Sequence, residues 1–125
     1  MPCKITYEAA GLYAKFTGVL TPKDVVTLAN VIQSPVYADS RYRIIDFLEV
    51  TNVCVNEIDL AYVHDLEFWF ELSCSKLLRV VVAKLPTVVN VLDWGRPLHA
   101  RAGSFALFSS LEDARHWIAW YSDEP

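Results

Sequence analysis

The chain has 125 residues, a net charge of −4 and an apolar content of 54%. This length suits one domain with its own core and is too short for two, so we expect a single domain over residues 1–125. The apolar content excludes a disordered chain, and the scattered basic residues form no patch for a nucleic-acid backbone. We see no secretory leader and no apolar run of about 20 residues, which leads us to expect a cytoplasmic protein without a membrane span.

Three cysteines, Cys3, Cys54 and Cys74, form an odd set without the C-x-x-C spacing. In a chain able to build its own core, this pattern predicts free thiols in a reducing compartment. Cys54 precedes a predicted helix start, where the helix dipole would lower the pKa of a thiol. Because no base lies near it in the sequence, we interpret Cys54 as a small apolar filler rather than a nucleophile.

The N-terminal part predicts an antiparallel hairpin. Residues 3–8 and 12–18 each alternate apolar and polar side chains, which is typical of strands with one wet face. Ala10 and Gly11 separate the two strands, and we expect Gly11 to take the positive φ of a tight turn.

A helix start follows at Thr21-Pro22-Lys23-Asp24, with Thr21 as N-cap and Pro22 at the first helical position. The helix is expected to end before Pro35, because proline disfavours helical backbone in the residue preceding it. An apolar stripe at helical spacing predicts the face toward a sheet: Val25, Leu28, Ala29 and Ile32.

Three runs, over residues 42–48, 78–83 and 105–108, are apolar on both faces. Such runs are typical of interior strands of a parallel sheet. Each is followed by a helical pattern, and residues 49–56 are predicted to be the loop after the first run. The element order predicts a small mixed α/β sheet of about five strands, beginning with the hairpin, and four helices.

The stretch Ile45-Asp46-Phe47-Leu48, followed by Val50-Thr51, resembles the centre of the STAS domain, the fold of bacterial anti-sigma-factor antagonists. Residues 108–118 resemble the C-terminus of small stand-alone SpoIIAA-like proteins with that fold, and residues 18–24 fit the start of their first helix. The resemblance covers most of the chain and implies the same fold, with a regulatory role exerted through a protein surface.

The chain departs from the antagonist pattern at one place. True antagonists carry an Asp-Ser-Ser-Gly-like turn at the head of the second helix, where a kinase phosphorylates a serine. The corresponding stretch here is Cys54-Val55-Asn56-Glu57, which has no hydroxyl group. We therefore expect that no phosphoserine switch operates at this position.

No combination of residues predicts catalysis, a metal or a cofactor. His64, His99 and His116 lack metal-ligand spacing, and we interpret them as solvated surface residues. Asp46 lies within an apolar strand, where we expect its carboxylate to cap a neighbouring loop. The chain is therefore not expected to be an enzyme.

Topology gives one candidate ligand site. In open α/β sheets, ligands bind outside the carboxyl ends of the parallel strands, where helix N-termini attract anions. The polar residues expected there are Asn52, Asn56, Lys84, Thr87 and Ser110. A simpler interpretation is that Asn56, Thr87 and Ser110 only cap their own helices.

The second predicted helix suggests self-association. On a helical wheel Ile58, Tyr62, Leu66 and Trp69 share one face, which we expect to pack on the sheet, whereas Glu57, His64, Glu67 and Glu71 mark the solvent side. Three further apolar residues widen the arc beyond what the sheet needs: Leu60, Val63 and Phe70. These residues predict a homodimer interface. Alternatively, residues 36–40 or 98–102 cover the arc within one chain.

Two functions remain open from the sequence. The first is a non-catalytic regulatory or partner-binding domain, as the STAS resemblance implies. The second is a small-molecule binding protein, with an apolar or weakly anionic ligand held between the sheet and the helices.

Overall fold

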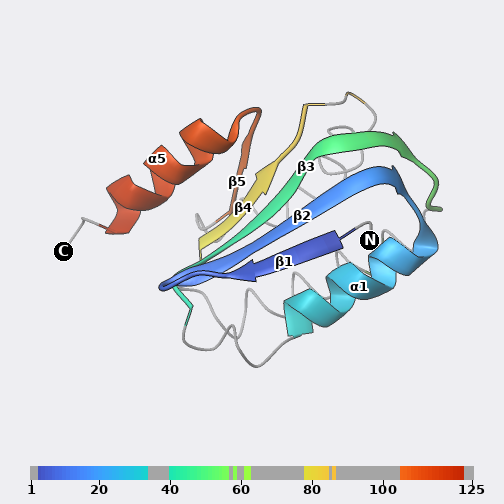
Figure 1. Cartoon of the computed structure of the whole chain (residues 1–125), viewed down its shortest axis with the longest axis horizontal. Helices are drawn as coiled ribbons and strands as arrows, with labels where there is room; N and C mark the ends of the chain where they lie inside the picture. The colour runs from blue at the N-terminus through green and yellow to red at the C-terminus, as the bar shows by residue number, and fades with distance from the viewer. Residues whose placement is uncertain are drawn as a thin grey trace.

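The computed structural model describes residues 3–33, 40–56, 58, 61–62, 78–84, 86 and 105–122. Its elements are β1 (Cys3–Tyr7), β2 (Gly11–Leu20), α1 (Pro22–Gln33), β3 (Tyr42–Val53), β4 (Leu78–Val82), β5 (Phe105–Phe108) and α5 (Leu111–Ser122). The strands form one sheet in the order β1-β2-β3-β4-β5 (Figure 1). The β1–β2 pair is antiparallel and the other three pairs are parallel.

The predicted mixed α/β sheet of five strands with an N-terminal hairpin is confirmed. Two of the four predicted helices are described, namely α1 and α5. The other two fall almost entirely outside the described residues. Within those two segments the structure describes a few helical residues: Ile58, Ala61, Tyr62 and Pro86.

Each face of the sheet carries its own apolar cluster, because successive side chains of a strand point to opposite faces. On the α1 face, Phe16 and Phe47 stack with ring centroids 5.3 Å apart, and Val31 of α1 packs into the same cluster. On the opposite face, Ala114 and Ile118 of α5 pack with a second set of strand residues: Ile44, Val80 and Val82. The two described helices therefore cover opposite faces of the sheet.

The turn of the hairpin differs from the expectation in one respect. Glu8 and Gly11 exchange backbone hydrogen bonds across the turn, but Gly11 does not have a positive φ. Its lack of a side chain serves a close approach instead, because a Cβ at this position would lie 2.5 Å from Cε1 of Tyr42.

The strand β3 is longer than predicted, and this is a correction: residues 49–53 are strand rather than loop. They are held by the end of β2, since Thr17 pairs with Glu49 and Leu20 with Val53. The register shifts twice along this pair, each time with an extra residue in β3. Gly18, at the second shift, has φ 76°, a backbone conformation that glycine adopts without steric cost.

The helix α1 begins as predicted. Asp24 accepts hydrogen bonds from the backbone N–H and the hydroxyl group of Thr21, at 2.8 and 3.2 Å. The buried stripe differs from the predicted one, since Val31 is buried together with Ala29. Val26 is 60% exposed.

Two arginines lie inside the protein. Arg43 of β3 and Arg79 of β4 are register partners, and their exposed fractions are 1% and 0%. They lie on the α1 face of the sheet, the face of Ile45 and Val81. Their burial interrupts runs that the sequence presents as almost wholly apolar.

Candidate functional site

The predicted ligand residues do not all meet at one point. Lys84 follows β4 and is exposed, and Ser110 follows β5. Because Val82 pairs with Phe108, these two residues leave neighbouring strands at the same edge of the sheet. The hydroxyl oxygen of Ser110 accepts a hydrogen bond of 3.1 Å from the N–H of Asp113, so Ser110 caps α5.

Asn52 and Asn56 lie further out. The last β3–β4 pair is Asp46 with Val82, whereas Asn52 pairs with Val19 of β2. Asn52 is six positions beyond Asp46 along β3, about 20 Å at the usual rise, whereas Lys84 is only two positions beyond Val82. The structure therefore separates Asn52 and Asn56 from Lys84 and Ser110, and Thr87 is outside the described residues.

We use the name tip for four exposed residues at and just after the ends of β2 and β3: Val19, Cys54, and Ile58 and Tyr62, which follow Cys54 by four and eight positions. The N–H of Cys54 donates a hydrogen bond of 2.7 Å to the carbonyl oxygen of Leu20, which holds the two strand ends together. Val19, Ile58 and Tyr62 are 44%, 79% and 51% exposed, and Cys54 is exposed as well.

The exposure of Ile58 and Tyr62 corrects the expectation that these two residues pack on the sheet. Both are helical residues and both side chains are turned to solvent. Helical periodicity identifies an apolar stripe but not the surface that the stripe meets. The other residues of the predicted arc lie outside the described part: Leu60, Val63, Leu66, Trp69 and Phe70.

A second group, which we call the Arg115 cluster, consists of Glu8, Tyr13, Tyr42, Asp46 and Arg115. Arg115 donates two hydrogen bonds to the carboxylate of Glu8, at 3.1 and 2.8 Å, and its Cζ lies 5.6 Å from the ring centroid of Tyr13. The hydroxyl group of Tyr42 donates to Glu8, and that of Tyr13 donates to Asp46. The cluster joins the N-terminal hairpin, β3 and α5.

The pKa values in the cluster follow from these contacts. The hydrogen bonds from Arg115 lower the pKa of Glu8, and the same pair raises the pKa of Arg115. Burial, followed by the hydrogen bond to Asp46, raises the pKa of Tyr13. Burial, followed by the bond to Glu8, raises the pKa of Tyr42. Both tyrosines are therefore held in the neutral, hydrogen-donating form.

The sequence suggested that Asp46 caps a neighbouring loop, but its carboxylate has other partners. One carboxylate oxygen accepts from Tyr13, and the other accepts from the N–H of Leu48 at 2.8 Å. Leu48 lies in the first register shift of β3, where the ladder leaves a backbone group without its strand partner. Asp46 is 3% exposed and both of its oxygens are engaged, so we interpret it as structural. A polar residue within an apolar run was the only sequence signal for this cluster.

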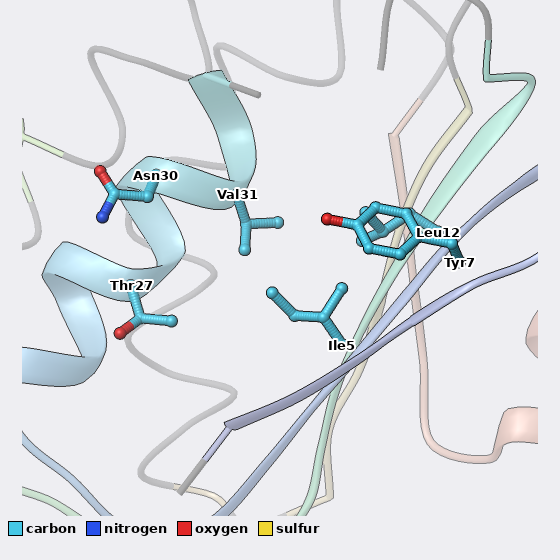
Figure 2. A pocket seen from close by; sticks show the side chains of 6 residues that line it. All are labelled: Ile5, Tyr7, Leu12, Thr27, Asn30 and Val31. Atoms are coloured by element: carbon cyan, nitrogen blue, oxygen red, sulfur yellow. The ribbon is translucent and has the colours of Figure 1, made fainter. Parts of the chain in front are cut away.

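A small pocket lies between β1 and α1. Its volume is about 210 Å³ and its lining is mostly apolar, from Ile5, Tyr7, Leu12, Thr27, Asn30 and Val31. Figure 2 shows Val31 of α1 pointing across the pocket toward Ile5 and Tyr7 of β1. Pockets for whole small-molecule ligands usually enclose about 300–1,000 Å³, so this one matches a smaller group.

The described part of the chain lacks two further features. None of its helices is both long and apolar enough to cross a membrane. Within the same residues, no group of three or more His, Cys, Asp or Glu side chains could hold a metal ion.

Strand order, hairpin and flanking helices together define the SpoIIAA-like fold, and the resemblance expected from the sequence is confirmed at the level of the fold. No protein-family model matches the sequence, and no curated protein matches it either.

Several solved structures are similar, and three of them illustrate the likeness. An anti-sigma factor antagonist from Mycobacterium paratuberculosis is 16% identical, with a TM-score of 0.62 over 94% of this chain and 92% of that one. The antagonist SpoIIAA in its unphosphorylated form is 10% identical, with a TM-score of 0.64 over 98% and 99%. The phosphorylated form of the Bacillus cell fate determinant SpoIIAA is 11% identical, with a TM-score of 0.63 over 93% and 98%.

Proposed function

We propose that this chain is a non-catalytic regulatory domain that binds a protein partner through the tip. The observation that carries this proposal is the exposure of two large apolar side chains, Ile58 and Tyr62, shortly after the end of β3 in the chain. Apolar side chains gathered at one surface commonly mark an interface. The likeness to anti-sigma factor antagonists, which by their name act on another protein, supports the same role.

The proposal includes one domain over residues 1–125 in the bacterial cytoplasm. The similarity to the unphosphorylated SpoIIAA structure covers 98% of this chain and 99% of that one, which supports a single domain. Self-association through Leu60, Val63 and Phe70 remains part of the prediction, although these residues lie outside the described part.

Affinity capture from native cells tests the proposal. We expect a specific protein to be retained by the wild type and lost with the double variant Ile58→Asp/Tyr62→Ala. The matched control is Trp120→Ala, since Trp120 is 59% exposed but lies on α5. Equal retention by all three proteins would contradict binding at the tip.

The alternative function is the binding of an apolar or weakly anionic small molecule. The pocket between β1 and α1 favours it, and the size of that pocket argues against it. Native mass spectrometry of protein purified from its own cells separates the two functions. A bound species of defined small mass would support the alternative, whereas capture of one protein, sensitive to the tip variant, would support the first.

A further inference from the structure

The strand β1 is at the end of the sheet among the strands that the structure describes. Glu8 and Gly11 exchange hydrogen bonds, at 2.8 and 3.4 Å. Hydrogen-bonded pairs alternate along an antiparallel ladder, so the backbones of Thr6 and Lys4 also face β2. The N–H and C=O groups of Ile5 and Tyr7 therefore point away from β2, toward the side of β1 on which the described residues form no further strand.

This edge offers both a protruding group and a recess. Tyr7 is 61% exposed, although it is a large aromatic residue within a strand. The pocket lies beside it, on the face of the sheet to which Ile5 and Tyr7 point (Figure 2). A two-fold interface uses one patch twice, so that patch must complement itself. Tyr7 is exposed and itself lines the apolar recess of about 210 Å³, so each copy offers both an accessible ring and a recess.

We propose that β1 pairs antiparallel with β1 of a second copy, with the two-fold axis at Thr6. In this register Ile5 of each copy lies opposite Tyr7 of the other copy. The two residues exchange both backbone hydrogen bonds, because their N–H and C=O groups point outward from β2. Thr6 then lies opposite Thr6 of the second copy, and Lys4 lies opposite its Glu8. The dimer forms one continuous ten-stranded sheet from two five-stranded sheets.

The side chains favour this register. Aromatic with β-branched, threonine with threonine, and opposite charges are the three cross-strand pairs known to stabilise sheets. The register supplies all three, as Tyr7 with Ile5, Thr6 with Thr6, and Lys4 with Glu8, although Glu8 also accepts hydrogen bonds from Arg115 and Tyr42 within its own chain. An axis at Ile5 would also align the backbones, but it would place Lys4 opposite Thr6 and Tyr7 opposite Cys3.

The pocket then receives the ring of Tyr7 from the second copy. Directly opposite residues share a face of the sheet, so this ring lies beside Ile5, over the gap between β1 and α1. Thr27 and Asn30 complete the lining on α1, but their polar atoms point away from the pocket (Figure 2), and the Thr27 hydroxyl group donates to the carbonyl oxygen of Lys23 at 3.1 Å. An anchoring aromatic side chain in a pocket is the usual centre of an interface.

Disulfide trapping tests the register. The background is a cysteine-free protein with Cys3→Ser, Cys54→Ser and Cys74→Ser, and the probes are Thr6→Cys and Lys4→Cys, both at exposed positions of β1. We expect Thr6→Cys to form a covalent dimer on mild oxidation at least about tenfold faster than Lys4→Cys. Lys4 is about 13 Å from Lys4 of the second copy along the strand. Equal rates, or no covalent dimer with Thr6→Cys, would overturn the proposal.

Sedimentation of the unmodified protein tests the association itself. We expect a monomer–dimer equilibrium, in which the fraction of dimer rises as the protein concentration is increased over roughly a hundredfold range. Tyr7→Pro should weaken it at least about tenfold, because proline removes an outward N–H and the ring but leaves the β1–β2 ladder intact. Thermal unfolding verifies that the variant folds, and Tyr62→Ala is the control for the tip. A monomeric wild type, or loss of the dimer with Tyr62→Ala but not with Tyr7→Pro, would overturn the proposal.

Discussion

Arg115 on α5 and Glu8 at the hairpin turn are 107 positions apart, yet the guanidinium donates two hydrogen bonds to the carboxylate, at 2.8 and 3.1 Å. This pair ties the last described helix to the first two strands. The helix α5 also packs against β5, where the ring centroids of Trp117 and Phe108 are 5.9 Å apart. The helix is thus fixed at two separate places.

A double-mutant cycle measures the worth of this pair. We expect Glu8→Gln and Arg115→Gln to share a coupling free energy of about 1 kcal/mol at neutral pH, near the upper end for surface pairs because the contact is bidentate. The side chains of Arg115 and Glu8 are 43% and 23% exposed, so solvent limits the value. Urea unfolding of the four proteins provides the measurement. A coupling indistinguishable from zero would show that α5 is held by its apolar contacts alone.

The same contact predicts a loss of stability in acid. The pKa of Glu8 is lowered in the folded state, so the carboxylate stabilises the protein above its unfolded pKa, near 4.5. That contribution disappears as the pH falls below this value and passes the lowered folded pKa. The wild type should therefore be more stable than Glu8→Gln at pH 7, and the difference should shrink in acid. A constant difference from pH 7 to about pH 2 would contradict the assignment.

Tyr13→Phe should destabilise the protein by about 1–3 kcal/mol. Asp46 is 3% exposed, and the substitution removes the hydroxyl donor from one of its carboxylate oxygens. The control is Tyr62→Phe, whose side chain is 51% exposed, and its effect should be near zero. Denaturant midpoints of the two variants give the comparison. Equal small effects would mean that water replaces the tyrosine hydroxyl at Asp46.

The sequence predicted the strands well because their apolar patterns are local. The three runs apolar on both faces did become interior or parallel strands. The extension of β3 to Val53 was not predicted, because polar residues there are held by backbone pairing with β2 rather than by burial. Likewise, periodicity placed Ile58 and Tyr62 on one helix face but gave the wrong surroundings for it.

The candidate sites were harder to predict, since they depend on contacts between distant residues. The Arg115 cluster joins residues near positions 10, 45 and 115, and none of its members forms a motif. The prediction that Asn52 and Lys84 lie together assumed that β3 and β4 end at the same level of the sheet. The different lengths of β3 and β4 separate Asn52 from Lys84 instead.

The head of the second helix should carry no regulatory phosphate. Cys54, Val55 and Asn56 follow β3 without a hydroxyl group, and the nearest one upstream belongs to Thr51, which is exposed in β3. We expect phosphopeptide mapping of protein from its native cells to find no stoichiometric phosphate between Thr51 and Asn56. Phosphate on Thr51 would show that the chain retains a kinase-operated switch at a shifted position.

Gly11→Ala should destabilise the hairpin by about 1–3 kcal/mol, the usual cost of overpacking. A Cβ at this position would lie 2.5 and 2.6 Å from carbons of the Tyr42 ring, and the ring cannot move away without breaking its hydrogen bond to Glu8. Combining Gly11→Ala with Tyr42→Ala removes the clash. The double variant should therefore lose less stability than the sum of the two single variants, as measured by urea unfolding. Strict additivity would show that Gly11 is required for its backbone conformation and not for the approach of Tyr42.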